Sequence, residues 1–460
     1  MGRYATYPEY KNSEVDWLGE IPAHWDVRKL KYVSSVQPSN VDKKAEENEL
    51  AVFLCNYTDV YNNEEIRSNI DFMRATATQR EIDKFLIREG DVIVTKDSES
   101  REDIAVPAYV AEDLEDTLCG YHLTHIRPVD VIGKFLFRLF ESTRFNGQFV
   151  VGANGVTRFG LPQHIIDNAF IALPPLPEQR AIARFLDHKT AQIDALIAKK
   201  EALLARLAAK RTALISHAVT KGLDPDAPMQ DSGIEWLGEI PSHWRVLQLR
   251  RFGGLVQTGP FGSQLHSHEY VEGGFPVVNP ANISDGHIVP NLQMTVDDET
   301  RKRLSRHVLQ VGDIVLGRRG ELGRAAYVGK REAGWLCGTG SILIRVSNPL
   351  LEPEYLDNYI RLPLIKDYLT VESVGSTMDN LNTDIINRLP VLVPPHTEQA
   401  EIVDHCGTVM VDLEYQTTRV QQAIDKLRQY RTALITHAVT GKIDVRTVPI
   451  PPLGSDAPFK

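Results

Sequence analysis

Two long stretches of the chain carry apolar residues at helical spacing. Residues 178–220 contain neither glycine nor proline and are rich in Ala, Leu, Lys, Arg and Gln, which favours one long helix. Gly222 is then expected to end it as a C-terminal cap. The apolar pairs that return to one face of this helix are Phe185-Leu186, Leu196-Ile197, Leu203-Leu204 and Leu214-Ile215.

The second stretch, residues 397–445, has the spacing of a coiled-coil seam. Counted from Thr417, apolar residues alternate at three and four positions, namely Leu413, Val420, Ile424, Leu427 and Leu434. We expect Gly407 to interrupt the first turns and Gly441 to end the helix.

Each predicted helix spans roughly 60 Å at about 1.5 Å per residue. Because one globule cannot bury so long a stripe, we expect the two helices to pack on each other in antiparallel orientation. The alternative is that each helix packs only on its own globule.

The segments before the helices have a different pattern. Short β-branched runs at residues 92–94 and 314–316 each follow a Gly-Asp turn, and Pro and Gly recur throughout. This pattern is typical of compact mixed α/β bodies. The predicted fold class is α+β, with two such domains separated by two long helices packed as an antiparallel coiled coil.

The chain is an internal repeat, which explains why both patterns occur twice. NSEVDWLGEIPAHWDVRKLK at 12–31 recurs as DSGIEWLGEIPSHWRVLQLR at 231–250, and RTALISHAVT at 211–220 recurs as RTALITHAVT at 431–440. EGDVIVTK, TLCGYHLTHIRP and IALPPLPEQ have counterparts in the same order. The period is too long for a stacked array, so a two-part unit is duplicated with pseudo-two-fold symmetry. The predicted boundaries are 1–177 and 223–396 for the bodies, 178–222 and 397–445 for the helices, and 446–460 for a tail.

Composition bounds the class of protein. Cys55, Cys119, Cys337 and Cys406 form no CxxC pair, and no stretch is apolar enough for a membrane span, so we expect a soluble cytoplasmic protein. The chain has 51 Lys+Arg against 61 Asp+Glu, a net charge of −10. Nucleic-acid binding would therefore need local basic surface or a partner that supplies positive charge.

The repeated motifs W-L-G-E-I-P-x-H-W, L-P-P-L-P-E-Q and R-T-A-L-I-S-H-A-V-T resemble those of the specificity subunit of type I restriction-modification systems, from Trp17 to about Asp444. The resemblance implies that each body is a target-recognition domain reading one half of an asymmetric, bipartite DNA site. It implies that the paired helices set the half-site spacing and bind methyltransferase subunits, expected in two copies, while the sequence leaves open whether restriction subunits join them. The implied process is DNA methylation in phage defence. No cofactor is expected in this chain, whereas S-adenosylmethionine is expected in the methyltransferase.

Polar residues on glycine-rich loops at equivalent places in the two bodies are the candidates for DNA contact, because such side chains read base edges and phosphates. In the first body they are Thr95, Lys96, Ser98, Arg101, Asn154, Thr157 and Arg158. In the second they are Ser263, Gln264, Arg318, Arg319, Arg324, Ser376, Thr377, Asn380 and Asn382. For each of these residues singly, a structural hydrogen bond is an alternative role.

The tryptophans have a structural interpretation. Trp17, Trp25, Trp236 and Trp244 lie in the segment that both repeats share. Readers of different sequences do not need identical parts for reading, so we expect these residues to pack each body onto the helix ends.

Motifs for catalysis are weak. His266, His268 and Glu269 lack zinc-site spacing, Val94 stands where a nuclease needs an acidic ligand, and no phosphate-binding GxxxxGK[ST] is present. We therefore expect no catalytic or metal residues. Two alternatives stay open: a non-catalytic protein-protein scaffold with two ligand-binding domains on a coiled-coil strut, and a self-contained enzyme.

Overall fold

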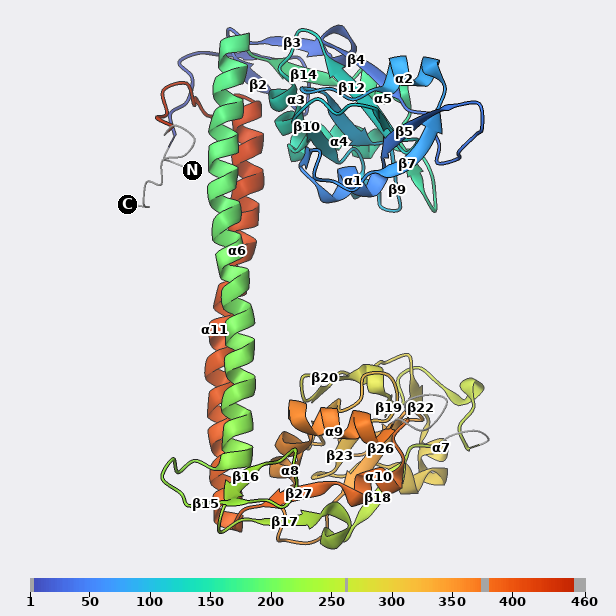
Figure 1. Ribbon diagram of the computed structural model, residues 1–460, viewed down its shortest axis with the longest axis vertical. Coiled ribbons are helices and arrows are strands. Elements are labelled where there is room, and N and C mark those ends of the chain that lie inside the picture. Colours follow the sequence, from blue (N-terminus) through green and yellow to red (C-terminus); the bar gives the residue numbers. More distant parts are fainter. Residues whose placement is uncertain (1–3, 261–263, 374–379, 451–460) are drawn as a thin grey trace. The chain divides into compact units, whose positions relative to one another are not determined.

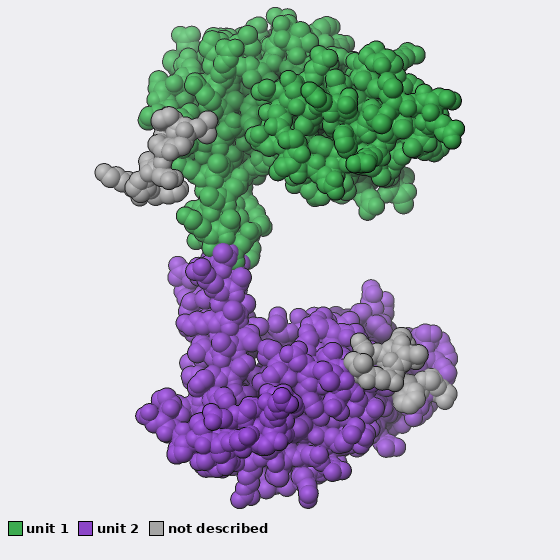
Figure 2. All heavy atoms as spheres, viewed as in Figure 1, with its two compact units in different colours: residues 1–201, 421–460 green, residues 202–420 purple. Residues whose placement is uncertain are grey.

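The chain forms two compact units, shown in different colours in Figure 2. The computed structural model describes residues 4–260, 264–373 and 380–450. Unit 1 contains residues 1–201 and 421–460, and unit 2 contains residues 202–420. Each unit therefore holds one globule and a segment of both long helices. None of the helices in the described ranges is long and apolar enough to cross a membrane.

The two long helices are α6 (Leu176–Lys221) and α11 (His396–Val439). α6 ends as predicted, because Gly222 follows it with a φ of +80°, a conformation that glycine adopts without strain. The expectation for Gly407 was wrong, since α11 runs through it without a break. A helical glycine costs about 1 kcal/mol relative to alanine, and the burial of neighbouring Ile402 and Cys406 in the core offsets that cost.

Segments of α6 and α11 pack in antiparallel orientation within each unit (Figure 1). In unit 1, Arg431 of α11 binds Asp194 of α6 at 3.0 Å, and Arg428 binds Glu201 at 2.9 Å. In unit 2, Ala218 of α6 shares a core with Ile402 of α11. The antiparallel pairing is confirmed, and each helix also packs on its own globule.

The seam of α11 differs from the prediction at one position. Leu413, Ile424 and Leu434 are buried, as the spacing predicts. Thr417 is exposed, and its neighbour Gln416 is half-buried in its place. The count from Thr417 was therefore off by one residue at this step, where 3.6 residues per turn allow either neighbour to face the partner.

The globule of unit 1 is built on a five-stranded mixed sheet of order β4-β12-β8-β10-β6 and a three-stranded sheet of order β11-β5-β7. Its central strand, β8, is buried at every position. The five strands are β4 (Ser34–Pro38), β12 (Leu123–Pro128), β8 (Val92–Thr95), β10 (Pro107–Val110) and β6 (Glu65–Ile66). The three are β11 (Thr117–Cys119), β5 (Leu50–Cys55) and β7 (Met73–Ala77). The two-stranded pairs are β1 (Tyr10–Asn12) with β2 (Glu20–Pro22), β3 (Asp26–Lys29) with β14 (Phe170–Leu173), and β9 (Asp97–Ser98) with β13 (Phe159–Gly160). The short helices are α1 (Tyr57–Asn62), α2 (Gln79–Phe85), α3 (Gly133–Phe140), α4 (Thr143–Gly152) and α5 (Gln163–Asp167).

The globule of unit 2 repeats this topology. Its sheets have the orders β18-β26-β23-β24 and β22-β19-β25, which match the first four strands and the three-stranded sheet of unit 1. The four strands are β18 (Leu255–Thr258), β26 (Ser341–Arg345), β23 (Ile314–Gly317) and β24 (Ala325–Tyr327). The three are β22 (Thr295–Val296), β19 (Phe275–Val278) and β25 (Leu336–Cys337). The pairs are β15 (Met229–Asp231) with β16 (Glu239–Pro241), β17 (Arg245–Gln248) with β27 (Pro390–Val393), and β20 (Ile283–Ser284) with β21 (His287–Ile288). The short helices are α7 (Asp298–Arg303), α8 (Pro353–Ile360), α9 (Pro363–Ser373) and α10 (Thr383–Arg388).

The repeated E-Q motif joins each long helix to its globule. The side chain of Gln179 accepts a hydrogen bond from the backbone N–H of Ile132, immediately before α3. Gln399 does the same for Glu352, immediately before α8. In both units this glutamine satisfies a donor at the start of a short helix, where donors lack intrahelical partners.

The tryptophans divide into two roles. Trp25 and Trp244 are buried and contact the first turns of α6 and α11 through Glu178 and Glu398, so the predicted packing on the helix ends is confirmed for them. Trp17 instead packs on Phe145 of α4, and Trp236 stacks on Tyr368 of α9. Trp17 and Trp236 therefore contact helices of their own globule, which corrects the prediction for these two residues. Residue type alone does not distinguish the two kinds of contact.

Candidate nucleic-acid interface

The repeated Gly-Asp turn holds the central strand of each globule in place. In unit 1, Arg127 donates two hydrogen bonds to Asp91, and His125 lies 2.7 Å from the same carboxylate. Burial opposes ionisation of Asp91, but the bonds from His125 and Arg127 outweigh it and lower the pKa of that carboxyl. In unit 2, Arg345 binds Asp313 in the same way. This pair is structural, because it joins the turn before the central strand to the neighbouring strand.

A cationic side chain follows the central strand in both units. Lys96 follows β8 and Arg318 follows β23. The backbone C=O of Lys96 accepts from Leu161 N–H, and that of Arg318 accepts from Leu381 N–H, so the two residues occupy equivalent positions. Desolvation lowers the pKa of both side chains.

The predicted loops of unit 1 come together around Asp97. Its carboxylate lies 2.7 Å from Nδ1 of His122 and accepts a hydrogen bond from Arg158 at 2.5 Å. Strand β9, which contains Asp97, pairs with β13 of the GANGVTRFG stretch. The loop after β8, the loop after β11 and the glycine-rich loop thus form one polar surface.

The other predicted residues of unit 1 differ in exposure. Thr95 is fully buried, and its hydroxyl accepts from the backbone N–H of Val106. Ser98 is also buried. Asn154 and Thr157 are exposed. Arg101 lies over the ring of Phe159 at 5.0 Å.

Aromatic residues that the sequence analysis did not select lie on the same surface. Tyr121 is 49% exposed, and the ammonium of Lys96 lies 4.4 Å from its ring centroid. Tyr57 and Tyr61 stack at 5.6 Å, and Tyr61 donates to Asp103 at 2.6 Å. The sequence signal for Tyr121 is that Tyr121-His122 of TLCGYH differs from Thr339-Gly340 of its counterpart WLCGTG.

In unit 2 the arginines after β23 have three different surroundings. Arg318 donates to Asn380 at 2.9 Å, which brings two predicted residues together. Arg319 is exposed. Arg324 donates to Glu321, which Lys366 also binds at 2.8 Å. Hydrogen bonds from Lys366 and Arg324 lower the pKa of Glu321 to about 2.

The remaining predicted residues of unit 2 provide less evidence for or against DNA contact. The side chain of Asn382 accepts from Asp384 N–H and Ile385 N–H and so caps α10. Gln264 is exposed. Ser263, Ser376 and Thr377 lie outside the described residues.

His266, His268 and Glu269 lack zinc-site spacing, and the contacts of these residues are structural. The two imidazole rings stack, and Glu269 accepts from the backbone N–H of His266 and pairs with Arg303. Within the described part of the chain, no group of three or more His, Cys, Asp or Glu side chains is placed to hold a metal ion.

Comparisons with known proteins agree with the repeat. A family model described as "Type I restriction modification DNA specificity domain" matches residues 22–206 and again residues 241–419. The specificity subunit of the type I restriction enzyme MjaVIII from Methanocaldococcus jannaschii is 23% identical over 458 residues, covering 96% of this chain and 98% of that protein. The EcoKI specificity subunit from Escherichia coli is 23% identical over 387 residues, covering 79% of this chain and 78% of its own length.

Solved structures share the fold. A chain from a structure of a type I R-M system, concerning its complex assembly and conformational transition, has a TM-score of 0.63 at 18% identity, covering 92% of this chain and 99% of that chain. The HsdS subunit from Thermoanaerobacter tengcongensis has a TM-score of 0.51 at 18% identity, covering 92% and 98%. Because the family model matches both repeats and most of the sequence, this chain belongs to the type I restriction-modification DNA specificity family.

Proposed function

We propose that this chain is the DNA-recognition subunit of a type I restriction-modification complex, in which each globule reads one half of an asymmetric, bipartite site. The observation that carries the proposal is the equivalence of Lys96 and Arg318, each at the end of the central strand and next to a glycine-rich loop. Around these shared positions the side chains differ, as two readers of different half-sites require.

The loops provide suitable chemistry for reading DNA. Around Lys96 they combine a cation, an exposed tyrosine and the Asp97–His122–Arg158 group. Around Arg318 they combine Arg319 and Asn380. Arginine, lysine and asparagine pair with guanine or adenine edges in the major groove, whereas exposed aromatic rings contact bases or sugars.

The proposal assigns phosphate neutralisation mostly to partners, because the chain has a net charge of −10. Methyltransferase subunits, in two copies, bind S-adenosylmethionine, carry out the chemistry and hold the duplex, while this chain contributes register and sequence. The paired helices α6 and α11 serve as the docking surface and set the half-site spacing. The isolated chain should then bind DNA poorly and the complex well, with binding that weakens steeply as salt rises. Tight, sequence-specific binding by the isolated chain would contradict this division of labour.

A body exchange tests the proposal. Residues 16–175 are replaced with the corresponding body of a related protein, and methylated adenines are mapped in a host that carries the methyltransferase. One half of the methylated sequence should change while the other half stays the same. An unchanged target, from a complex that still assembles and methylates, would overturn the proposal in favour of a scaffold role.

A further inference from the structure

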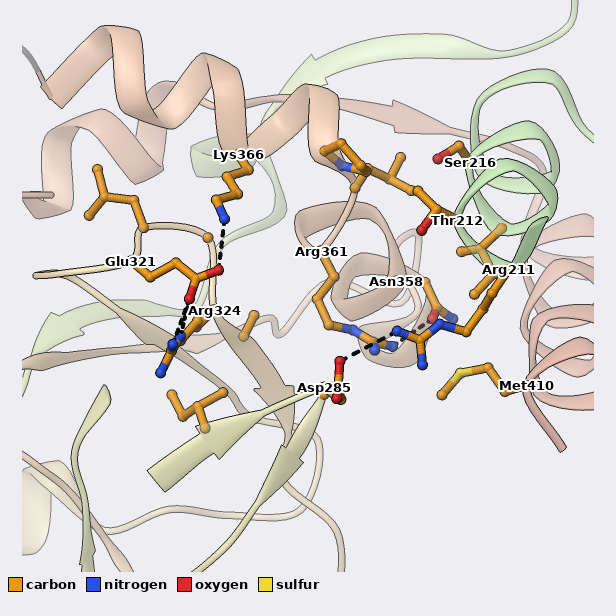
Figure 3. Close-up of a pocket in the computed structure, with 18 residues that line it drawn as sticks. Arg211, Thr212, Ser216, Asp285, Glu321, Arg324, Asn358, Arg361, Lys366 and Met410 are labelled. Atoms are coloured by element: carbon orange, nitrogen blue, oxygen red, sulfur yellow. Dashed lines mark hydrogen bonds and ion pairs between the residues drawn. The ribbon is translucent and has the colours of Figure 1, made fainter. Parts of the chain in front are cut away.

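A cavity of about 230 Å³ lies in unit 2 beside the last turns of α6. Its walls also come from the turn between α8 and α9 and from the loop after β23 (Figure 3). Among the described residues that line it, Arg211, Arg324, Arg361 and Lys366 are cationic, whereas Asp285 and Glu321 are anionic. Cations thus outnumber carboxylates in this lining, and Thr212 and Ser216 of α6 lie beside them.

The equivalent place in unit 1 is filled by the chain's own carboxylates. Arg431 is the counterpart of Arg211 in the repeated R-T-A-L-I motif. Its guanidinium binds Asp194 at 3.0 Å and Glu141 at 3.0 Å, and it also pairs with Glu64. Only 16% of the Arg431 side chain is exposed, so its charge is neutralised internally.

Unit 2 has lost one of these carboxylates at its matching position, whereas Glu414, which corresponds to Asp194, is exposed. Helices α3 and α8 both span eight residues, and each is preceded by a backbone N–H that the motif glutamine binds. In this register Arg361 replaces Glu141, because each is the first residue after its helix. Counted from the E-Q motif, Gly407 of α11 replaces Asp187 of α6, which in unit 1 binds Arg138. A carboxylate that binds Arg431 in unit 1 has thus become a guanidinium in unit 2, and a carboxylate that binds Arg138 has become a glycine.

Arg211 and Arg361 of unit 2 are incompletely neutralised. Arg211 has Asp285 at 3.4 Å, with 41% and 73% of the two side chains exposed, a geometry worth little in water. Arg361 has its Nε 3.0 Å from the buried Asp357, behind the cavity wall, and donates to Asn358 at 2.8 Å. In Figure 3 the side chains of Arg211 and Arg361 both extend into the cavity.

We propose that this cavity is a binding site for a phosphate group, with Arg211 and Arg361 as its principal ligands and Lys366 at its edge. Guanidinium groups bind phosphate oxygens bidentately and more tightly than they bind water. A water occupies about 30 Å³ of liquid, so the cavity has room for a phosphate or pyrophosphate group. The phosphate comes either from a small phosphorylated molecule or from a DNA strand.

Titration of the full chain with pyrophosphate tests the site. Calorimetry should detect one saturable site, which Arg211→Gln weakens by about tenfold or more, as expected for losing one charge-assisted contact. Arg306→Gln, which removes an exposed arginine of unit 2 outside the cavity lining, should leave binding unchanged. Gly407→Asp is the complementary variant. A Cβ at Gly407 meets nothing within 4 Å, and Gly407 lines a neighbouring cavity together with Arg361, so a carboxylate there should compete for Arg361 and weaken binding as well.

The salt dependence of DNA binding by the assembled complex identifies the source of the phosphate. If the site holds a DNA phosphate, Arg211→Gln lowers the slope of log K against log salt by about one, and pyrophosphate competes with DNA. If it holds a free ligand, the slope is unchanged and pyrophosphate still binds. The proposal is overturned if pyrophosphate binding and the salt slope are both insensitive to Arg211→Gln and Gly407→Asp in variants that melt at the wild-type temperature. The body-exchange result is independent of these measurements, so the two proposals can fail separately.

Discussion

The indole Nε1 of Trp25 donates a hydrogen bond to the Glu178 carboxylate over 3.0 Å, and Trp244 makes the same bond to Glu398 over 3.0 Å. In both units a tryptophan from the repeated W-L-G-E-I-P-x-H-W motif is thus bound to the first turn of a long helix. The two glutamates differ in their surroundings. Glu178 is 6% exposed and also accepts from Tyr7 at 2.5 Å, whereas Glu398 is 20% exposed.

The first prediction is that Glu178→Gln destabilises the chain more than Glu398→Gln. Replacing the more buried carboxylate leaves both Trp25 and Tyr7 without a charged acceptor, a loss of about 1 to 3 kcal/mol. Denaturant unfolding of the two variants measures the difference. Equal effects, or a larger effect at Glu398, would show that burial does not govern the strength of these contacts.

The second prediction separates the two readers. Lys96→Met should weaken recognition of one half-site, and Arg318→Met should weaken recognition of the other, by about 1 to 3 kcal/mol each. Methionine keeps most of the apolar stem that packs in each loop. Mapping of methylated adenines provides the measurement, and Arg80→Met, on exposed α2, is the control. The same half-site responding to both variants would contradict the assignment of one reader to each unit.

The third prediction concerns the helices as a spacer. Inserting seven residues after Glu201 in α6 and another seven after Val420 in α11 preserves the heptad pattern of both helices. It lengthens each by about 10 Å, or about three base pairs of DNA. The mapped site should keep both half-sites while its gap grows by about three base pairs. An insertion in α6 alone breaks the antiparallel register and should abolish methylation, whereas an unchanged gap in the double insertion would rule out the spacer role.

The fourth prediction is a pH dependence at Asp357 of α8. Burial raises the pKa of its carboxyl from 3.8 to about 6, with Arg361 opposing the rise. Between these pH values the folded state binds more protons than the unfolded state, so stability falls as pH rises from about 4 to about 6. Thermal melting across this range should show the fall in the wild type and a flatter profile in Asp357→Asn. An identical slope in both proteins would mean that Asp357 is ionised throughout.

The duplicated architecture could be predicted from the sequence because the repeated motifs are long and the helical stripes unambiguous. The C-terminal end of α6 followed from Gly222, whose positive φ is a local property. The effect of Gly407 could not be predicted in the same way. The free-energy cost of a glycine within a helix is a local property, whereas the burial that offsets this cost depends on tertiary contacts.

The candidate interface was harder to predict residue by residue. Lys96 and Arg318 were selected because each follows an apolar strand, and the structure places them at equivalent positions. Thr95, one residue earlier, is buried because every position of β8 is buried, and Asn382 caps a helix. Polar residue type alone does not separate these roles. The aromatic surface at Tyr121 was missed because a comparison of the repeats favours positions where both copies have similar residues. Two readers of different half-sites are expected to differ in the residues that contact DNA.

The division of the chain into units also has a consequence for the order of synthesis. Unit 2 is continuous, whereas unit 1 needs residues 421–460 to complete a globule that begins at the N-terminus. A ribosome therefore releases every part of unit 2 before the last part of unit 1. Until then Leu186 and Ile193, which share a core with Leu434 in the finished protein, lack that partner. The first globule to be made is thus the last to be finished, and chaperone contact during translation should concentrate on its half of α6.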